Sequence, residues 1–393
     1  MKIEVASRVG QVEEYYFSRK LREIAEMRAA GMDIINLGIG SPDRMPSPKV
    51  IERLCVESAK DGQHGYQSYA GIMPLKKAFA DWCGRHLAVD LDPASEVLPL
   101  IGSKEGIMHI SMTYLEEGDE VLVPDPGYPT YQSAALLTGA SVRKYRLSSA
   151  EGWQPNLERL AKEDLSRVKI MWVNYPHMPT GAKAASGTFE ALVKFGLEHQ
   201  ILICHDNPYA FILNDNPQSM LSVPGAKEVV IELHSLSKTF NMAGWRVGFL
   251  AGAGERIREV LRFKSNMDSG MFKPLQLAAA EALHLTASWY KEINDVYRSR
   301  RVLAEELLES LGCTFDRDQV GMFVWARIPS DYESGRAMAD LILQEAHTFI
   351  TPGSIFGRGG EAYVRISLCS KEEIIKEAIQ RCSAVSKTKV RTS

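Results

Sequence analysis

The sequence lacks the features that would mark a zinc protein, a disulfide-stabilised protein or a membrane protein. Its six cysteines are scattered, and none forms a Cys-x-x-Cys pair, so neither a zinc or other metal site nor a disulfide framework is indicated. No apolar run reaches the roughly 18 to 20 residues of a membrane span, and Met1–Arg8 has no apolar core of signal-peptide length. We therefore expect a soluble, cytoplasmic protein whose cysteines are reduced.

An excess of charge of either sign is also missing. The 46 Lys and Arg residues against 49 Asp and Glu residues give a net charge of −3, whereas nucleic-acid and membrane-surface binders usually carry a basic stripe. Glycine (30) and proline (18) occur at ordinary frequency in the 393 residues, which argues against a long disordered stretch. The composition is that of a globular protein that binds small molecules, with neither nucleic acid nor membrane as a partner.

Short apolar runs alternate with stretches of helical periodicity between about residues 95 and 250. The runs are Glu96–Ile101, Glu120–Val123, Ser141–Leu147, Val168–Val173, Ile201–Cys204, Val229–Leu233 and Val247–Ala251, with helical periodicity in Lys104–Leu115, Pro129–Leu137 and Phe189–His199. This alternation predicts an α/β fold with a mostly parallel, seven-stranded type of sheet that has helices on both faces. Ligands of such sheets bind outside the carboxyl ends of the strands.

The pattern changes after about residue 253 to long helices, followed by a smaller α+β arrangement. The helical stretches are Glu255–Lys264, Leu275–Leu285, Tyr290–Leu311, Arg336–Glu345 and Lys371–Ala384, and the strands are Met322–Ile328 and Tyr363–Leu368. We expect an N-terminal segment (1–44), including a helix in Val12–Ala30, that packs with the small domain. The other expected parts are a large domain (45–288), a small C-terminal domain (289–386) and a flexible tail (387–393).

The segment His234–Phe240 places a lysine, Lys238, between small hydroxyl residues directly after a buried strand. A lysine becomes nucleophilic when its ammonium is desolvated or lies near another cation, and Arg246 can supply that charge as well as a phosphate clamp. A solvated lysine in a surface turn is the commoner situation. The pattern thus gives Lys238 as a candidate for imine formation.

A carboxylate, Asp206, ends a second buried strand, 32 residues before Lys238. A buried carboxylate needs a cationic partner, and a pyridinium nitrogen is such a partner, because this pair makes pyridoxal phosphate an electron sink. Tyr209 could then donate to the phenolate oxygen of that cofactor. Taken singly, Asp206 would more often be a helix cap or turn residue.

Two further turns follow apolar strands. Gly102-Ser103-Lys104 joins a strand to a helix, so free N–H groups, a hydroxyl and an ammonium converge where a phosphate could bind. Pro126-Gly127-Tyr128-Pro129 places an aromatic ring at the same edge, where it could stack on a planar cofactor. Each turn alone is a common structural feature.

Together these residues resemble the class I/II, fold-type I pyridoxal-phosphate aminotransferases. Seven motifs occur in the order of that family: Asn36–Gly40, Gly102-Ser103-Lys104, Pro126–Pro129, Pro179-Thr180-Gly181, Asp206-x-x-Tyr209, Ser235-x-Ser237-Lys238 with Arg246, and Tyr363–Ser367. The stretches Ser265–Phe272 and Gly102–Gly106 are most similar to the alanine and LL-diaminopimelate aminotransferase branch. The resemblance spans nearly the whole chain and implies pyridoxal 5'-phosphate as cofactor.

The resemblance also assigns roles. It implies that Lys238 forms the Schiff base and is the catalytic base, that Asp206 pairs with the pyridine nitrogen, that Tyr209 contacts the ring oxygen and that Tyr128 stacks on the ring. The residues implied for the phosphate are Ser103, Lys104, Ser235 and Arg246, together with Tyr66 from a neighbouring subunit, which implies a homodimer with shared active sites. Arg365 is similar to the arginine that binds the substrate α-carboxylate. Gly40 would leave room for that carboxylate.

One position departs from the pattern of the family. An asparagine that binds the cofactor ring oxygen usually precedes Pro-Thr-Gly, but Met178 stands here. A methionine cannot donate that hydrogen bond. Either Asn174 or His177 compensates from the same loop, with Asn174 preferred, or Tyr209 alone holds the oxygen.

The implied reaction is ping-pong transfer of an amino group from an L-amino acid to a 2-oxo acid, with 2-oxoglutarate and glutamate as one pair. The alternatives are a β-lyase or another reaction on the same scaffold, and a non-catalytic effector-binding module of aminotransferase shape. A nucleotide-binding α/β protein is disfavoured because the sequence has neither a Walker loop nor a Gly-x-Gly-x-x-Gly motif. By position, Arg44 is the candidate for binding a second carboxylate of a dicarboxylic substrate.

Overall fold

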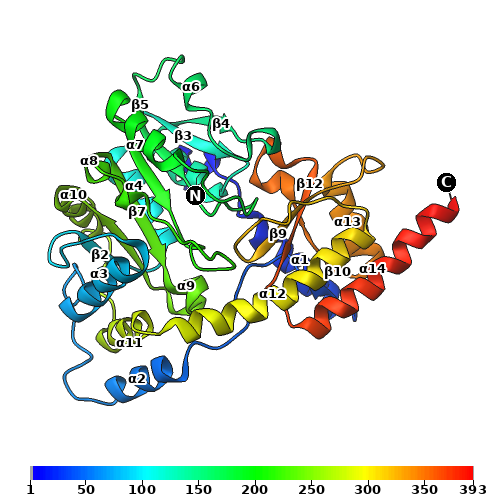
Figure 1. Ribbon diagram of the computed structural model, residues 1–393, viewed down its shortest axis with the longest axis horizontal. Coiled ribbons are helices and arrows are strands. Elements are labelled where there is room, and N and C mark those ends of the chain that lie inside the picture. Colours follow the sequence, from blue (N-terminus) through cyan, green and yellow to red (C-terminus); the bar gives the residue numbers. More distant parts are fainter. Residues whose placement is uncertain (1–2, 393) are drawn as a thin grey trace.

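A seven-stranded mixed sheet forms the centre of the larger lobe in the computed structural model, which describes residues 3–392 and side chains as far as residue 384 (Figure 1). Its strand order is β2-β8-β7-β6-β5-β3-β4. The strands are β2 (Val97–Leu100), β3 (Glu120–Asp125), β4 (Ser141–Arg146), β5 (Val168–Val173), β6 (Leu202–Asp206), β7 (Val230–Ser235) and β8 (Gly248–Gly252). The predicted α/β fold is confirmed, since each of the seven apolar runs overlaps one strand.

The sheet is parallel except at β8, which runs antiparallel to both β2 and β7. The alternation of side chains along the strands separates two apolar layers: Ile170 and Trp172 of β5 face one layer, whereas Met171 and Val173 face the other. Helices α4 (Ser103–Tyr114), α5 (Pro129–Thr138) and α10 (Gly254–Lys264) cover the first layer. Helices α3 (Met73–Leu87), α7 (Thr188–His199) and α11 (Lys273–Leu283) cover the second.

A smaller lobe follows in the C-terminal third of the chain. Its three-stranded antiparallel sheet has the order β11-β12-β9 and consists of β9 (Phe323–Arg327), β11 (Thr351–Pro352) and β12 (Tyr363–Ser367). Helices α13 (Gly335–Ala346) and α14 (Glu372–Thr392) pack around it, and the long helix α12 (Ala287–Ser310) runs from one lobe to the other (Figure 1). Helix α14 contains most of the expected tail 387–393, whereas Ser393 lies outside the described residues.

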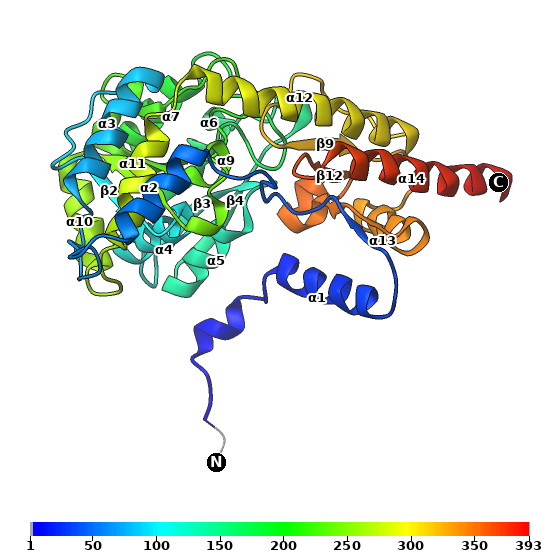
Figure 2. The same cartoon turned by 90° about the horizontal axis from the view of Figure 1, so that it is seen from below.

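The N-terminal segment packs on the smaller lobe. Strand β1 (Ile35–Asn36) pairs in parallel with β10 (Thr348–Phe349), and Ile24 of helix α1 (Tyr16–Ala29) lies in a small apolar cluster with side chains of the smaller lobe. Figure 2 shows that α1 lies alongside the region where the two lobes meet. The N-terminal chain is therefore placed to reach a site between the lobes.

The remaining elements connect these layers. They are the helices α2 (Pro48–Ser58), α6 (Leu157–Leu160), α8 (Ala226–Val229) and α9 (Leu236–Thr239), and the 3-10 turns Ser7–Gln11, Ser149–Glu151, Met220–Ser222, Ala243–Trp245, Gly353–Phe356 and Arg358–Gly360. None of the six cysteines, all of which lie in the described part of the chain, is in a disulfide bond, and Cys55 alone among them is exposed. None of the helices in the described part of the chain combines the length and the apolar character that crossing a membrane requires.

Candidate active site

A cavity of about 580 Å³ lies at the carboxyl ends of the parallel strands, where the sheet faces the smaller lobe. It collects side chains from both lobes and from helix α1. The predicted site residues that line it are Gly40, Ser103, Lys104, Tyr128, Asn174, Asp206, Tyr209, Ser235, Lys238, Arg246 and Arg365. The structure thus brings these eleven candidates together, although they span more than 300 residues of sequence.

Lys238 lies in the short helix α9, directly after β7. Its ammonium donates a hydrogen bond of 2.6 Å to the carbonyl oxygen of Gly40, and among the described residues no carboxylate pairs with it. Burial lowers the pKa of Lys238, and the nearby cations Arg365 and Arg246 act in the same direction. A buried amine whose pKa is lowered is suited to nucleophilic attack and to taking up a proton.

Asp206 is the last residue of β6 and has one free oxygen. Its Oδ2 accepts a hydrogen bond of 2.8 Å from the hydroxyl of Tyr131, whereas its buried Oδ1 has no partner. Burial raises the pKa of Asp206 to about 6. An unpartnered carboxylate oxygen in a buried position is costly, so this group fits a cationic ligand.

Arg365 of β12 is buried on the opposite side of the cavity. Its Nη2 donates to the carbonyl oxygen of Gly38 at 3.0 Å, its Nη1 lies 3.3 Å from the sulfur of Met178, and its Nε has no partner. The guanidinium carbon also lies 3.8 Å from the ring centroid of Phe323. Burial lowers the pKa of Arg365 to about 10, which leaves it charged at neutral pH. A buried guanidinium without an anionic partner fits the carboxylate of a substrate.

Gly40 has a packing role that differs from the expected one. A Cβ at this position would lie 2.3 Å from the ring of Phe323, so the absence of a side chain makes room for that ring. Phe323 in turn contacts the guanidinium of Arg365. Gly40 therefore helps to position the Arg365 guanidinium, because it makes room for the ring that packs against it. Its carbonyl oxygen also holds the Lys238 ammonium.

The start of helix α4 and the turn that holds Arg246 form one corner of the cavity. Gly102 has a φ of +80° and precedes the helix without a side-chain cap, which leaves the first N–H groups of α4 free to bind an anion. A Cβ on Gly102 would lie 2.0 Å from Nη2 of Arg246, so glycine allows the guanidinium to reach this corner. Ser103 and Ser235 line the same cavity. This corner has the donors that a phosphate group requires.

Lys104 is less directly placed for a phosphate than its position in the sequence suggests. Its ammonium lies above the ring of Tyr15, 4.4 Å from the ring centroid. Burial lowers the pKa of Lys104, and the charge of Arg246 contributes to the decrease. Lys104 therefore adds positive charge near the phosphate corner and also contacts the N-terminal segment.

The loop that carries Met178 leaves the ring-oxygen contact to other residues. Asn174 follows β5 and is tied to the backbone, because its Nδ2 donates to the carbonyl oxygen of Asp206 and its Oδ1 accepts from the N–H of Met178 at 2.7 Å. The His177 ring is bound to the hydroxyl of Thr180 at 2.7 Å and is not among the residues that line the cavity. Asn174 and Met178 both line the cavity, so Asn174 stays the preferred candidate.

Aromatic side chains that the sequence did not single out complete the site. Tyr131 lies on helix α5, one turn after the Tyr128 motif, and holds Asp206. Tyr15 and Phe17 at the start of α1, and Phe356 of the smaller lobe, line the cavity. The spacing of apolar residues in the N-terminal segment predicted a helix but carried no signal that it borders the site.

Besides His177, two candidates, Tyr66 and Arg44, lie outside the cavity. Tyr66 is 95% exposed, and the neighbouring Gln67 forms an isolated antiparallel bridge with Gly270. Arg44 donates to Oε1 of Glu292 at 2.6 Å and does not line the cavity. Within this chain, therefore, neither side chain reaches the site.

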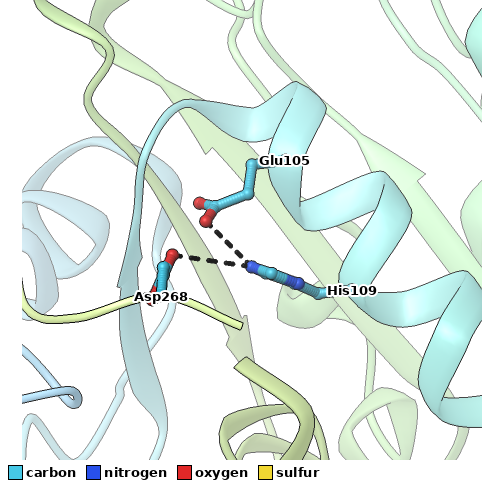
Figure 3. Close-up of side chains that lie close together, drawn as sticks. All are labelled: Glu105, His109 and Asp268. Atoms are coloured by element: carbon cyan, nitrogen blue, oxygen red, sulfur yellow. Dashed lines mark ion pairs between the residues drawn. The ribbon is translucent and has the colours of Figure 1, made fainter. Parts of the chain in front are cut away.

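A buried charged cluster supports the phosphate corner from behind (Figure 3). Nε2 of His109 on α4 lies 2.9 Å from Oε1 of Glu105 and 4.0 Å from Oδ2 of Asp268, whose other oxygen pairs with the ammonium of Lys264. Burial opposes ionisation, but the hydrogen bonds from His109 and Asp268 lower the pKa of Glu105 to about 2. Burial and the proximity of Glu105 raise the pKa of Asp268 to about 6. The cluster fixes the first turn of α4 against residues 264–268.

The donor set of the cavity fits pyridoxal 5'-phosphate. A pyridinium nitrogen matches the free oxygen of Asp206, a phosphate matches the helix N-terminus and Arg246, and a carbonyl carbon would meet the amine of Lys238. Arg365 remains available for a second ligand, the carboxylate of an amino acid or a 2-oxo acid.

Comparisons with known proteins agree with this chemistry. The family model for aminotransferase class I and II matches residues 32–381. The LL-diaminopimelate aminotransferases of Moorella thermoacetica and Desulforudis audaxviator are 42% and 41% identical over 98% and 97% of both chains, respectively. The substrate-bound structure of BacF from Bacillus subtilis superposes with a TM-score of 0.93 at 35% identity and covers 98% of each chain. The chain therefore belongs to the class I and II aminotransferases, and it is a pyridoxal-phosphate-dependent enzyme that transfers amino groups.

Proposed function

We propose that the enzyme moves an amino group from an L-amino acid to a 2-oxo acid by a ping-pong mechanism, with 2-oxoglutarate and glutamate as one substrate pair. The observation that carries the proposal is a pair of buried groups in the cavity that Lys238 also lines. One is the free oxygen of Asp206 and the other is the unpaired guanidinium of Arg365. The first suits a cationic ring and the second suits the carboxylate of the substrate.

Each of these residues has one task in the proposed reaction. The bound cofactor supplies the electron sink that makes the substrate α-proton acidic. Arg365 binds the α-carboxylate in a bidentate manner and thereby orients the Cα–H bond toward Lys238. The Nζ atom of Lys238 would take the proton from the α-carbon and release it on the other side of the amino nitrogen, at the carbon that receives the amino group, so that the proton lost at one carbon is gained at the other. Asp206 holds the ring nitrogen protonated, because its ionised form is stabilised by that positive charge.

We also propose that two copies form a dimer with shared sites in the cytoplasm. Exposed apolar side chains gather in the segments around Tyr66 and Phe272, namely Tyr66, Tyr69, Met73, Met267 and Phe272. The bridge between Gln67 and Gly270 holds these segments side by side. Burying such a surface against a second copy would be favourable and would bring Tyr66 to the phosphate corner of the neighbour. Six cysteines with no disulfide bond among them agree with a reducing compartment.

The proposed reaction is tested with a panel of L-amino acids and the cofactor-loaded enzyme. Donors should convert the bound cofactor to its pyridoxamine form, followed by its absorbance, and 2-oxoglutarate should reverse the change and yield glutamate. Ammonia or pyruvate released without a 2-oxo acceptor would instead indicate a β-lyase. A bound cofactor that no amino acid converts would indicate an effector-binding role.

The substitution Met178→Asn is expected to move the pH at which the absorbance of the bound cofactor changes. The Met178 side chain lines the cavity and has no N–H, so asparagine would add a donor for the ionised ring oxygen. One hydrogen bond is worth about 1 kcal/mol, which corresponds to a shift of up to roughly 0.7 pH units. A spectrophotometric titration of both proteins measures the shift. An unchanged titration would show that Asn174 already supplies the contact.

A further inference from the structure

The cavity has an apolar wall that neither the cofactor nor the α-carboxylate uses. The wall consists of Phe17 and Leu21 of α1, Ile39, and Phe356 of the smaller lobe. The side chains of Phe17 and Phe356 lie close to the position of the carboxylate, because their ring centroids are 5.7 Å and 4.6 Å from the guanidinium carbon of Arg365. A substrate bound to Arg365 would therefore place its side chain along this wall.

The charges around the cavity are of nearly one sign. Its lining includes the cations Lys104, Lys238, Arg246 and Arg365, whereas Asp206 is the only carboxylate among the described residues that line it. The phosphate offsets part of this positive charge at its own corner but not along the wall. A substrate with a second ammonium would have to desolvate it without an anionic partner, which is costly. A second carboxylate, as in 2-oxoglutarate, is not repelled by the cations that line the cavity.

The segments that we expect the neighbouring subunit to bring to the site add no carboxylate that could bind a distal ammonium. Residues Gly65–Leu75 contain no charged side chain. In Ser265–Phe272 the single acidic residue is Asp268, and its carboxylate is already paired with Lys264. These two segments thus supply no carboxylate for a distal ammonium.

We propose that the enzyme takes amino donors with apolar or aromatic side chains and discriminates against donors with a distal ammonium. This inference rests on the proposed transamination and names the substrate class of the same site. The proposed donors differ from the substrate in the names of the relatives, LL-diaminopimelate, because diaminopimelate carries a distal ammonium as well as a distal carboxylate. The wall of α1 is the part of the site that selects the side chain.

Two measurements on the cofactor-loaded enzyme test the proposal. Calorimetry compares 3-phenylpropionate with 5-aminopentanoate, which share the carboxylate and lack the α-amino group of a donor, and 3-phenylpropionate is expected to bind at least tenfold more tightly. Rapid mixing then compares the rates of cofactor conversion by phenylalanine, leucine, ornithine and LL-diaminopimelate. The first two are expected to convert the cofactor at least tenfold faster per unit concentration.

The variant Leu21→Glu tests the wall itself. A carboxylate at this position should reverse part of the preference, so 5-aminopentanoate should bind more tightly and 3-phenylpropionate more weakly than in the parent enzyme. Leu197→Glu on helix α7 is the matched control, because Leu197 has similar exposure to Leu21 and does not line the cavity. It should leave both affinities unchanged.

The outcomes separate the two proposals. Conversion by LL-diaminopimelate or ornithine as fast as by phenylalanine would overturn the inference and leave transamination in place. Equal binding of the two carboxylates, or the same response in Leu21→Glu and Leu197→Glu, would also overturn it. If no amino acid converts the cofactor, transamination fails, and a preference for 3-phenylpropionate would still support an apolar wall.

Discussion

The substitution Lys238→Ala is expected to abolish transamination while leaving the protein folded. The side chain ends in a buried amine that faces the cavity, with a single hydrogen bond to the carbonyl oxygen of Gly40, so its removal deletes the proposed base and breaks no ion pair. Loss of a general base alone costs on the order of 10² to 10⁴ in rate, and loss of the covalent link to the cofactor adds to it. Single-turnover conversion of the bound cofactor measures the effect.

Reduction with borohydride provides the companion measurement on the unmodified enzyme. The pyridoxyl group should become fixed on the peptide that contains Lys238, and mass spectrometry of a digest locates it. Lys104 serves as an internal control, since its ammonium also lines the cavity but stands above the ring of Tyr15. A label on Lys104, or on no lysine, would contradict the assignment.

The substitution Asp206→Asn should have opposite effects on stability and activity. Burial raises the pKa of Asp206 to about 6, against about 3.9 in an unfolded chain. The folded cofactor-free protein thus holds this proton more tightly than the unfolded chain does. This tighter binding of the proton contributes about 3 kcal/mol to the free energy of unfolding below pH 4, and the contribution is lost as the pH rises through 6. Asparagine keeps an acceptor for the hydroxyl of Tyr131, and because it does not ionise, the variant does not lose stability as the pH rises.

Chemical denaturation of the two cofactor-free proteins at several pH values measures this difference. At pH 8 the Asn variant should be the more stable protein, and the two curves should converge near pH 4. With cofactor bound, the variant should transaminate on the order of 100-fold or more slowly, because the ring nitrogen loses its anionic partner. A variant that is no more stable at pH 8, or that reacts at the parent rate, would show that Asp206 is a structural residue.

Strand positions and strand-end residues were predictable from sequence because they follow local rules. Buried strands are short apolar runs, and Asp206 was placed at the carboxyl end of such a run. The structure shows that Asp206 and Ser235 end neighbouring parallel strands. The antiparallel direction of β8 left no such signal, since a strand buried on both faces looks the same in either direction. Helices α2 and α3 were missed as well, although α3 has a regular apolar face.

The parts of the site that depend on packing between distant segments could not be predicted. Gly40 was expected to make room for a carboxylate, but the ring that it accommodates belongs to Phe323, 283 residues later. The wall formed by Phe17 and Leu21 depends on how α1 docks, which no local pattern encodes. Arg44 was a candidate by position alone, and the structure pairs it with Glu292 of α12.

The division of the site between the two lobes has a mechanical consequence. Arg365 belongs to β12 of the smaller lobe, and α1 is attached to the same lobe through β1 and β10, whereas Asp206 and Lys238 are anchored in the larger sheet. A substrate whose α-carboxylate is bound by Arg365 and whose amino group faces Lys238 would span the boundary between the two lobes. The segment between the α-carboxylate and the α-nitrogen is the same in every α-amino acid, so a shift of the smaller lobe against the larger sheet would misalign the α-proton from Lys238 for all donors alike.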